Sequence, residues 1–557
     1  MLTVLPFNTP VEFPDGNKLS VLEILSTNGY LLESNCGGRG TCGKCLIELV
    51  NGVLYNKEGN VVTPDNGNRY LACQVYPRED CTVKIEISQA ASKASSELIS
   101  KKSKTAFPKR VGLAIDIGST TVAAMLVDLS NNDILAVETE TNPQRAYGAD
   151  VISRIDFACR EHSGKNGVLI LQELIVQCLN SLISRITTNY GYSSSALEAV
   201  YIGGNTTMLQ LFWGIEPKGL AVAPYRSDIA GVKSGKAGEI GLDLPENTPV
   251  ITLPVIASFV GADTVAAVLE AGIDRSDSLS LMIDLGTNAE IVLGKNGRML
   301  ATSTAAGPAF EGSQLKHGMR AVPGAIHKIV PGNRRSMFDA RGSKFGIIPG
   351  SDGLSRTHSQ VQYERQPDLL NQDGELDIDV IGGIPATGIC GSGMVDAIAA
   401  LRTLGIITPS GRLLSGKEYI LVKTEDSGNG QDITVTQADI REIQLVKASI
   451  SAGIKILLEA YGEELSSVIH IFVAGAFGNY INLDNARLIG LLPNLPGERF
   501  HQIGNAAGLG VALSLAGGQD FLARAENIVR ETQHVELASY NGFQNRFIKS
   551  LNLEEGS

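Results

Sequence analysis

The sequence predicts a small α+β domain at the N-terminus, joined by a polar connector to a larger, duplicated α/β body. Three observations carry this prediction: a glycine-threaded cysteine cluster among short alternating apolar segments, a Ser- and Lys-rich stretch, and one strand–turn–strand pattern that occurs twice. At 557 residues the chain is too long for one hydrophobic core. We therefore expect the segments 1–88, 89–110, 111–280 and 281–557.

The composition is that of an ordinary globular protein, with 43% hydrophobic and 19% charged residues. The formal net charge of −12 argues against binding to nucleic acid or to anionic membranes, because both would repel a net anion. No signal peptide is evident, and the longest apolar run, LPVIASFVGADTVAAVLEAG, is interrupted by Asp263. Eight cysteines in so long a chain do not predict a disulfide framework, so we expect a cytoplasmic protein.

Three cysteines lie close together in SNCGGRGTCGKCLIEL, with the spacing Cys36-x5-Cys42-x2-Cys45, and Cys73 follows in YLACQVYP. A [2Fe–2S] cluster needs four thiolates, and the plant-type pattern differs from this one by a single residue in the first gap. The interleaved glycines allow positive-φ turns and bring backbone N–H groups close to sulfur. A four-cysteine zinc site usually has two CxxC pairs, whereas this segment has one. Ordinary core thiols are the remaining alternative.

Cys81 competes with Cys73 for the fourth position. We choose Cys73, because Cys81 opens a predicted strand, CTVKIEIS, where it would pack as a small apolar side chain. A hairpin is predicted from LTVLPFN and VEFPDG, and a short helix closed by Gly29 from LSVLEILSTNG. This segment resembles the adrenodoxin-like [2Fe–2S] ferredoxins, which implies a ferredoxin-like β-grasp fold.

The repeated pattern is a buried strand that ends in an aspartate, makes a tight turn and returns as a second strand. It occurs in GLAIDIGSTTVAAMLVDL at Asp116 and in SLMIDLGTNAEIVLG at Asp284. Such turns present N–H and hydroxyl groups to phosphate oxygens, and the aspartates would hold a hydrated Mg²⁺. One copy would be a weak signal, and two structural β-turns are the alternative. The predicted phosphate-binding residues are Gly118, Ser119, Thr120 and Thr121 in the first copy, and Gly286, Thr287 and Asn288 in the second.

Two further glycine-rich segments are candidates for nucleotide contacts. In GGIPATGICGSGMVDAIAALRTLG a helix is predicted from about Met394, and Gly391, Ser392 and Gly393 precede it as an anion or ribose site. In VIHIFVAGAFGNYIN a buried strand runs into Gly475, Ala476 and Gly478, whose small size would allow close approach of adenosine. A third segment, IGNAAGLGVALSLAGG, predicts a helix of small residues, which we interpret as a close-packed hinge or core helix; a ligand contact is the alternative.

The order of these motifs, with GGNTTM and GPAFEG between them, resembles the ASKHA superfamily of sugar and acetate kinases, chaperone ATPases and actin. That resemblance implies a duplicated, ribonuclease H-like α/β fold that binds ATP with Mg²⁺. Joined to a [2Fe–2S] domain, the chain resembles one family, the ATP-dependent reductive activators of corrinoid proteins (RACo). The connector leaves no room for the separate middle domain that some relatives carry.

The family resemblance implies an ATP-hydrolysing iron–sulfur reductase. It would transfer a low-potential electron from its cluster to the cobalt(II) of a corrinoid protein, restoring the cobalt(I) used by a methyltransferase system. An external electron donor is also implied, and whether the chain forms a homodimer stays open. Rival functions are an electron donor to another enzyme, such as a 2-hydroxyacyl-CoA dehydratase, a small-molecule kinase with a fused ferredoxin module, and a nucleotide sensor.

Three carboxylates are candidates for orienting the hydrolytic water: Asp284, Glu290 and Glu311. For Glu290 the alternative is an ordinary surface carboxylate, because it alternates off the second turn. The remaining cysteines, Cys159, Cys178 and Cys390, are expected to be small buried residues.

Overall fold

The computed structural model describes residues 1–5, 9–11, 13, 19–27, 32, 40, 45–63, 68–85, 110–162, 164–305, 307, 310, 312, 314–332, 369–370, 376–475 and 477–554. The chain divides into two compact units. Unit 1 comprises Met1–Gly307, Gly453–Asn479 and Arg499–Asn541, and unit 2 comprises Pro308–Ala452, Tyr480–Glu498 and Gly542–Ser557. The four segments expected from the sequence remain a prediction, and the connector 89–110 lies outside the described residues except for Arg110.

The N-terminal domain is built on a five-stranded sheet in the order β2-β1-β7-β3-β5, with β1 parallel to β7. Its elements are β1 (Leu2–Leu5), β2 (Thr9–Val11), α1 (Val21–Thr27), β3 (Leu46–Asn51), β5 (Arg69–Leu71) and β7 (Cys81–Ile85), with β4 (Leu54–Tyr55) and β6 (Tyr76–Pro77) as a separate pair. Helix α1 starts at a capping box, because Ser20 Oγ accepts from Glu23 N at 3.3 Å and the Glu23 carboxylate accepts from Ser20 N at 2.7 Å. The predicted hairpin, helix, final strand and β-grasp fold are confirmed, while Gly29 lies outside the described residues.

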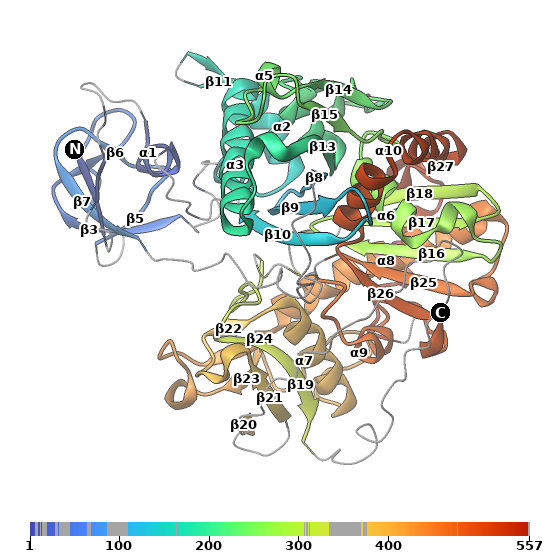
Figure 1. Ribbon diagram of the computed structural model, residues 1–557. Coiled ribbons are helices and arrows are strands. Elements are labelled where there is room, and N and C mark those ends of the chain that lie inside the picture. Colours follow the sequence, from blue (N-terminus) through green and yellow to red (C-terminus); the bar gives the residue numbers. More distant parts are fainter. Residues whose placement is uncertain are drawn as a thin grey trace. The chain divides into compact units, whose positions relative to one another are not determined.

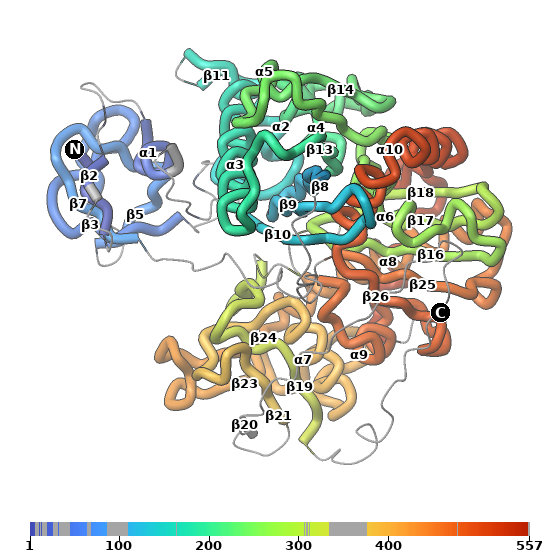
Figure 2. The backbone as a smooth tube through the Cα atoms, viewed as in Figure 1, coloured from blue at the N-terminus to red at the C-terminus, as the bar shows by residue number. Residues whose placement is uncertain are grey.

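The body of unit 1 contains two six-stranded sheets (Figures 1 and 2). The first has the order β10-β9-β8-β13-β15-β14 and the second β26-β25-β16-β17-β18-β27. The first consists of β8 (Val111–Ile117), β9 (Thr121–Asp128), β10 (Ile134–Thr141), β13 (Leu197–Gly204), β14 (Lys233–Lys236) and β15 (Pro249–Thr252). The second consists of β16 (Ser280–Leu285), β17 (Ala289–Lys295), β18 (Arg298–Thr304), β25 (His470–Ala474), β26 (Phe500–Gly504) and β27 (Thr532–His534). In both, an antiparallel meander of three strands continues from its first strand into two parallel strands, which confirms the predicted duplication.

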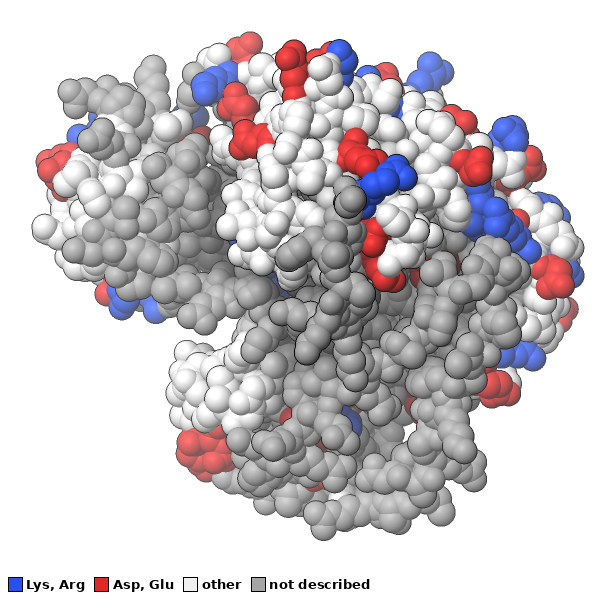
Figure 3. Space-filling view, in the orientation of Figure 1, with Lys and Arg blue, Asp and Glu red and all other residues white. Residues whose placement is uncertain are grey.

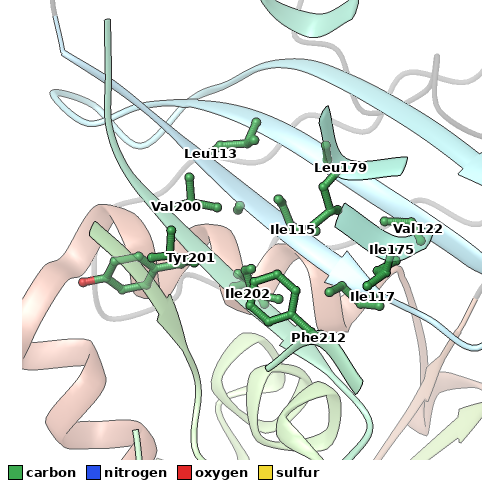
Figure 4. Packing of buried hydrophobic residues seen from close by; sticks show 14 of the residues in the cluster. Leu113, Ile115, Ile117, Val122, Ile175, Leu179, Val200, Tyr201, Ile202 and Phe212 are labelled. Carbon is green, nitrogen blue, oxygen red and sulfur yellow. The ribbon is translucent and has the colours of Figure 1, made fainter. Parts of the chain in front are cut away.

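The helices of unit 1 cover and join these sheets. They are α2 (Val151–Ala158), α3 (Gly167–Tyr190), α4 (Thr206–Phe212), α5 (Ala237–Ile240), α6 (Ala262–Ala271) and α10 (Ala506–Glu531), and the short strands β11 (Glu161–His162) and β12 (Lys165–Asn166) form a small hairpin. Ile115, Ile202, Leu179 and Phe212 show how β8, β13, α3 and α4 share one core (Figure 4).

Helices α6 and α10 contribute to the cores of both sheets. Ala266 and Val511 belong to the first core, and Val268 and Ile528 to the second. The two helices pack so closely that a Cβ at Gly510 would lie 1.8 Å from the carbonyl oxygen of Ala266. The segment IGNAAGLGVALSLAGG is therefore a core helix, as predicted.

Unit 2 carries smaller sheets and a helical layer. Its elements are β19 (Ala325–Pro331), β20 (Leu369–Leu370), β21 (Leu376–Val380), β22 (Gly388–Ile389), α7 (Gly391–Thr403), β23 (Glu418–Val422), β24 (Ile433–Thr436), α9 (Leu483–Leu488) and α11 (Phe543–Lys549). Helix α8 (Gln437–Tyr461) begins in unit 2 and ends in unit 1. Helix α7 begins at Gly391, three residues before the expected start at Met394, so the prediction of a loop at Gly391–Gly393 is wrong.

Two helices, α3 and α10, are long and apolar enough to cross a membrane by length and composition. In each helix, 50% of the most apolar stretch of 18 residues is buried inside the fold, and core helices of globular proteins pass the same test of length and composition. Acidic and basic side chains are interspersed over the described part of the face in Figure 3.

Candidate functional site

The two predicted phosphate turns come together in unit 1. Each turn is closed by a backbone hydrogen bond, from Gly118 N to Thr121 O at 3.1 Å and from Gly286 N to Asn288 O at 2.9 Å. The Oγ1 of Thr287 lies 3.2 Å from Ser119 Oγ and 3.4 Å from Thr120 Oγ1. The fold thus brings hydroxyl groups from turns far apart in the sequence within hydrogen-bond distance of one another.

A group of carboxylates surrounds these turns. Burial, and to a smaller extent the charge of Asp263, raise the pKa of Asp116 and of Asp284 to about 7. Burial also raises the pKa of Asp263 to about 6 and that of Glu290 well above its ordinary value. Glu290 is partly buried and accepts a hydrogen bond from Ser303 Oγ at 3.1 Å. The mutual repulsion of these groups favours a cation among them.

Sequence reasoning missed Asp263 as a site residue and treated it only as a break in an apolar run. It lies in the first turn of α6, where its Oδ1 accepts from Thr264 N at 2.8 Å. A Cβ at Gly261 would lie 2.5 Å from Asn205 Cα and 2.8 Å from Asp263 Oδ1, so the backbone at Gly261 packs closely against both residues. A charge directly after Gly261-Ala262, inside an apolar run, is the signal that could have identified it.

Asn505 was also missed. It caps the N-terminus of α10, and its side chain donates a hydrogen bond to Asp116 that lowers the pKa of this carboxyl against the larger effect of burial.

The donor set fits a hydrated Mg²⁺. Among the described residues, no three His, Cys, Asp or Glu side chains are close enough together to enclose a metal ion. Mg²⁺ keeps several waters and is bound by one or two carboxylates together with substrate phosphates. Asp116 and Asp284, at the ends of β8 and β16, supply carboxylates of that kind.

The loop after β25 lies against the second turn. Gly475 has a φ of +90°, and a Cβ there would lie 2.5 Å from the carbonyl oxygen of Leu285 and 2.7 Å from Asp284 Oδ1. The side chain of Gln502 donates to the carbonyl of Gly478 at 2.8 Å. Gly475 therefore contacts Asp284, whereas a Cβ at Gly478 would lie 2.2 Å from the carbonyl oxygen of Ala474. Ala476 lies outside the described residues.

The first turn of α7 has a packing explanation within unit 2. A Cβ at Gly391 would lie 2.2 Å from the carbonyl oxygen of Phe310, and one at Gly393 would lie 2.2 Å from that of Ile326. Ser392 Oγ donates to the carbonyl of His327 at 3.2 Å. A nucleotide contact of these residues stays a prediction.

Two of the predicted cluster ligands are described, and both are buried. A hydrogen bond from Cys45, with weaker ones from Gln74 and from the backbone of Gly40, lowers the pKa of the Cys73 thiol to about 6 against the opposing effect of burial. Thiolate character at Cys73 is the chemistry that iron requires of a ligand. Cys36 and Cys42 lie outside the described residues, as does the candidate Glu311.

The other thiols differ from Cys73. Burial raises the pKa of Cys81 to about 11 and that of Cys178 to about 12, as expected for packed, inert side chains. Cys390 is buried, whereas Cys159 is only partly buried.

Three family profiles match successive parts of the chain. The 2Fe-2S iron-sulfur cluster binding domain matches residues 4–78, the RACo middle region 111–276, and the C-terminal domain of RACo, the ASKHA domain, 278–556. The RACo middle region coincides with the first sheet and its helices, which is the segment expected to form the first half of the duplicated body.

Curated relatives agree with these profiles. The corrinoid activation enzyme RamQ of Eubacterium limosum is 34% identical over 447 residues, which are 77% of this chain and 68% of that protein. The [Co(II) methylated amine-specific corrinoid protein] reductase of Methanosarcina barkeri is 28% identical over 452 residues, covering 79% and 76%.

A solved structure, the reductive activator for a corrinoid, iron-sulfur protein, superimposes with a TM-score of 0.67 at 26% identity over 100% of this chain and 98% of that one. The C-terminal profile alone spans half of the 557 residues. On this coverage, and on the identity to RamQ, the chain belongs to the RACo family.

Proposed function

We propose that this protein is an ATP-dependent reductive activator, which returns the cobalt(II) of a corrinoid protein to cobalt(I) with an electron from its own [2Fe–2S] cluster. The observation that carries the proposal is the union, in one chain, of a [2Fe–2S] domain and two phosphate turns that meet at Ser119 and Thr287. The names of the similar proteins, an activation enzyme and two reductive proteins for corrinoid partners, support the substrate class.

The proposed cluster ligands are Cys36, Cys42, Cys45 and Cys73. The lowered pKa of Cys73 and its hydrogen bond with Cys45 support the two described members of this set. The cluster supplies single-electron transfer at a potential near about −400 mV for the plant type. Because one electron leaves in each cycle, an external low-potential donor must replace it.

The proposed ATP site lies at the two turns. Their amides and hydroxyls would bind the phosphates, while Asp116 and Asp284 would hold Mg²⁺ through its waters. The candidates for orienting the attacking water are Asp263, Asp284, Glu290 and Glu311. The raised pKa values of Asp263 and Glu290 support them as groups that could accept a proton from this water. Gly475, Ala476 and Gly478, in the loop after β25, are proposed to contact the rest of the nucleotide. A nucleotide contact of Gly391, Ser392 and Gly393 is a separate proposal.

ATP has an energetic role in this scheme. Each 100 mV by which the acceptor is harder to reduce than the donor costs about 2.3 kcal/mol per electron. ATP can supply this free energy by favouring the complex in which the corrinoid protein is docked, which requires tighter nucleotide binding in that complex. A cytoplasmic location and a homodimer are compatible with this scheme and remain proposals.

The deciding experiment is anaerobic absorption spectroscopy of a cobalt(II) corrinoid protein mixed with this protein and a reductant. We expect cobalt(I) to form with ATP and to form far less without it. No effect of ATP on the cobalt spectrum would overturn the proposal. Phosphate appearing on an added sugar or acid, instead of free phosphate, would identify a kinase.

A further inference from the structure

A guanidinium group is completely buried behind the first phosphate turn. Arg154, on α2, and Asn142, just before the 3₁₀ helix Pro143–Tyr147, are both 0% exposed. Removing an arginine from water costs several kcal/mol unless its hydrogen bonds are satisfied. The position of this side chain therefore calls for a physical reason.

All four carbonyl groups of the turn are engaged by hydrogen bonds. Asn142 Nδ2 donates to Gly118 O at 2.8 Å, and Asn142 N donates to Thr120 O at 2.9 Å. Arg154 Nη2 donates to Ser119 O, and Gly118 N to Thr121 O at 3.1 Å. Asn142 and Arg154 thus supply three of the four donors, and both are completely buried.

Arg154 is itself held in place by two further contacts. Its Nε donates to the carbonyl of Gly148 at 2.8 Å, and its Nη1 lies 3.0 Å from the sulfur of Met208. Asn142 is fixed in turn, because its Oδ1 accepts from Gln144 N at 3.0 Å. Asn142 and Arg154, which we call the brace, are thus each held in place by further contacts besides those to the turn.

Two physical effects on a phosphate follow from this brace. A carbonyl oxygen carries partial negative charge and repels phosphate. Because the carbonyls of the turn accept hydrogen bonds from within the protein, the turn presents its amides and hydroxyls to a phosphate. A buried positive charge bonded to the turn also attracts anions, and more strongly than in water because solvent is excluded from it. The second effect grows with the number of phosphate charges.

We propose that Arg154, together with Asn142, is a positioning residue that holds the first phosphate turn for a polyphosphate and adds its charge to polyphosphate affinity. The inference rests on the proposed function, in which this turn binds ATP. Arg154 reaches the ligand only through the turn, so its removal alters the affinity for phosphate groups without removing a direct contact to the nucleotide.

The test compares nucleotides that differ only in phosphate number. We would prepare the full-length, cluster-loaded protein with Arg154→Met and measure dissociation constants of ATP, ADP and AMP by calorimetry. We expect ATP to be weakened at least about tenfold, ADP less, and AMP less than about twofold, from the size of charge-assisted hydrogen bonds. Arg154→Lys keeps the charge and should recover most of the loss for ATP.

Arg185→Met is the matched control. Arg185 also lies in the first half, on α3, but it is partly exposed and pairs with Glu140 at 2.8 Å and Glu138 at 3.6 Å. This variant should leave all three dissociation constants unchanged. Cluster absorption and the thermal unfolding midpoint would be recorded for every variant.

Equal weakening of ATP, ADP and AMP would overturn the inference, since it would indicate general loss of structure, and so would unchanged affinities. If Arg154→Met does not fold, Asn142→Ser tests the brace by the same comparison, with a loss confined to ATP and ADP expected. Wild-type protein that binds no ATP would overturn the proposed function itself. Wild-type binding combined with an unaffected Arg154→Met would overturn only the present inference.

Discussion

The cluster domain and the paired phosphate turns are built in opposite ways. The proposed cluster ligands fall between Cys36 and Cys73, in one small domain. Asp116 and Asp284 are 168 positions apart and meet only because two similar sheets pack on a shared pair of helices. A site that is local in sequence can be identified by spacing, whereas a site assembled by the fold depends on residues whose partners are distant.

The two regions also differ in electrostatics. Hydrogen bonds lower the pKa of Cys73 to about 6 and favour the charged form, while burial raises the pKa of Asp116 and Asp284 to about 7 and disfavours it. The contacts of Cys73 thus favour the thiolate that the proposed cluster requires. The repulsion among the carboxylates would be relieved by the proposed Mg²⁺.

The largest expected effect separates Cys73 from Cys81. Cys73→Ser should lose the [2Fe–2S] cluster almost entirely, because serine is a poor iron ligand, whereas Cys81→Ser should keep it. Iron content and visible absorption after anaerobic reconstitution measure the difference. ATP hydrolysis should survive in both variants. A full cluster in Cys73→Ser, or none in Cys81→Ser, would assign the fourth ligand to Cys81.

Asp116→Asn and Asp284→Asn test the second region, the paired phosphate turns. Each should slow ATP hydrolysis by about 10²- to 10³-fold, the usual effect of removing one electrostatic contact to the reacting groups. The unfolding midpoint at pH 8 should rise, because asparagine removes a buried charge. Asp133→Asn, at an exposed position in the first half, is the control. Loss of cluster absorption in either variant would contradict the independence of the two regions.

Gly475→Ala tests the contact between the loop after β25 and Asp284. A methyl group there would meet Asp284 Oδ1 and the Leu285 carbonyl, so hydrolysis should fall by about tenfold or more. Gly297→Ala is matched, because Gly297 has a φ of +80° but nothing within 4 Å of its Cβ position. Equal losses in the two variants would show that backbone strain, rather than displacement of Asp284, is responsible.

The smallest expected effect is on pH dependence. Asp116 and Asp284 have native pKa values of about 7 and unfolded values of about 3.9, so the native state binds extra protons between these limits. The free energy of unfolding should therefore fall as pH rises from about 4 to about 7 and then level off. Unfolding midpoints from pH 5 to pH 8 measure this. The double variant Asp116→Asn/Asp284→Asn should lose that part of the slope, and an unchanged slope would refute the assignment.

Sequence alone predicted the β-grasp domain, the duplication and the two turns, because each has a local pattern of strands, cysteines or glycines. It missed Asp263 and Arg154 for a common reason. The importance of Asp263 depends on where α6 packs, and Arg154 donates to the backbone carbonyls of Gly148 and Ser119, which leave no trace in the sequence.

The start of α7 was misjudged for a different reason. Glycine has low helix propensity, so Gly391–Gly393 was interpreted as a loop. In the fold these glycines instead allow the first turn of the helix to approach the Phe310 and Ile326 carbonyls. Tertiary packing outweighs intrinsic propensity at this position.

The contact between Gly510 of α10 and the Ala266 carbonyl of α6 has a consequence for motion in the body. Two helices that touch through their backbones have no flexible side chains between them to absorb a change in separation. The helix pair therefore fixes the separation of the two six-stranded sheets, and a larger side chain at Gly510 would have to push them apart.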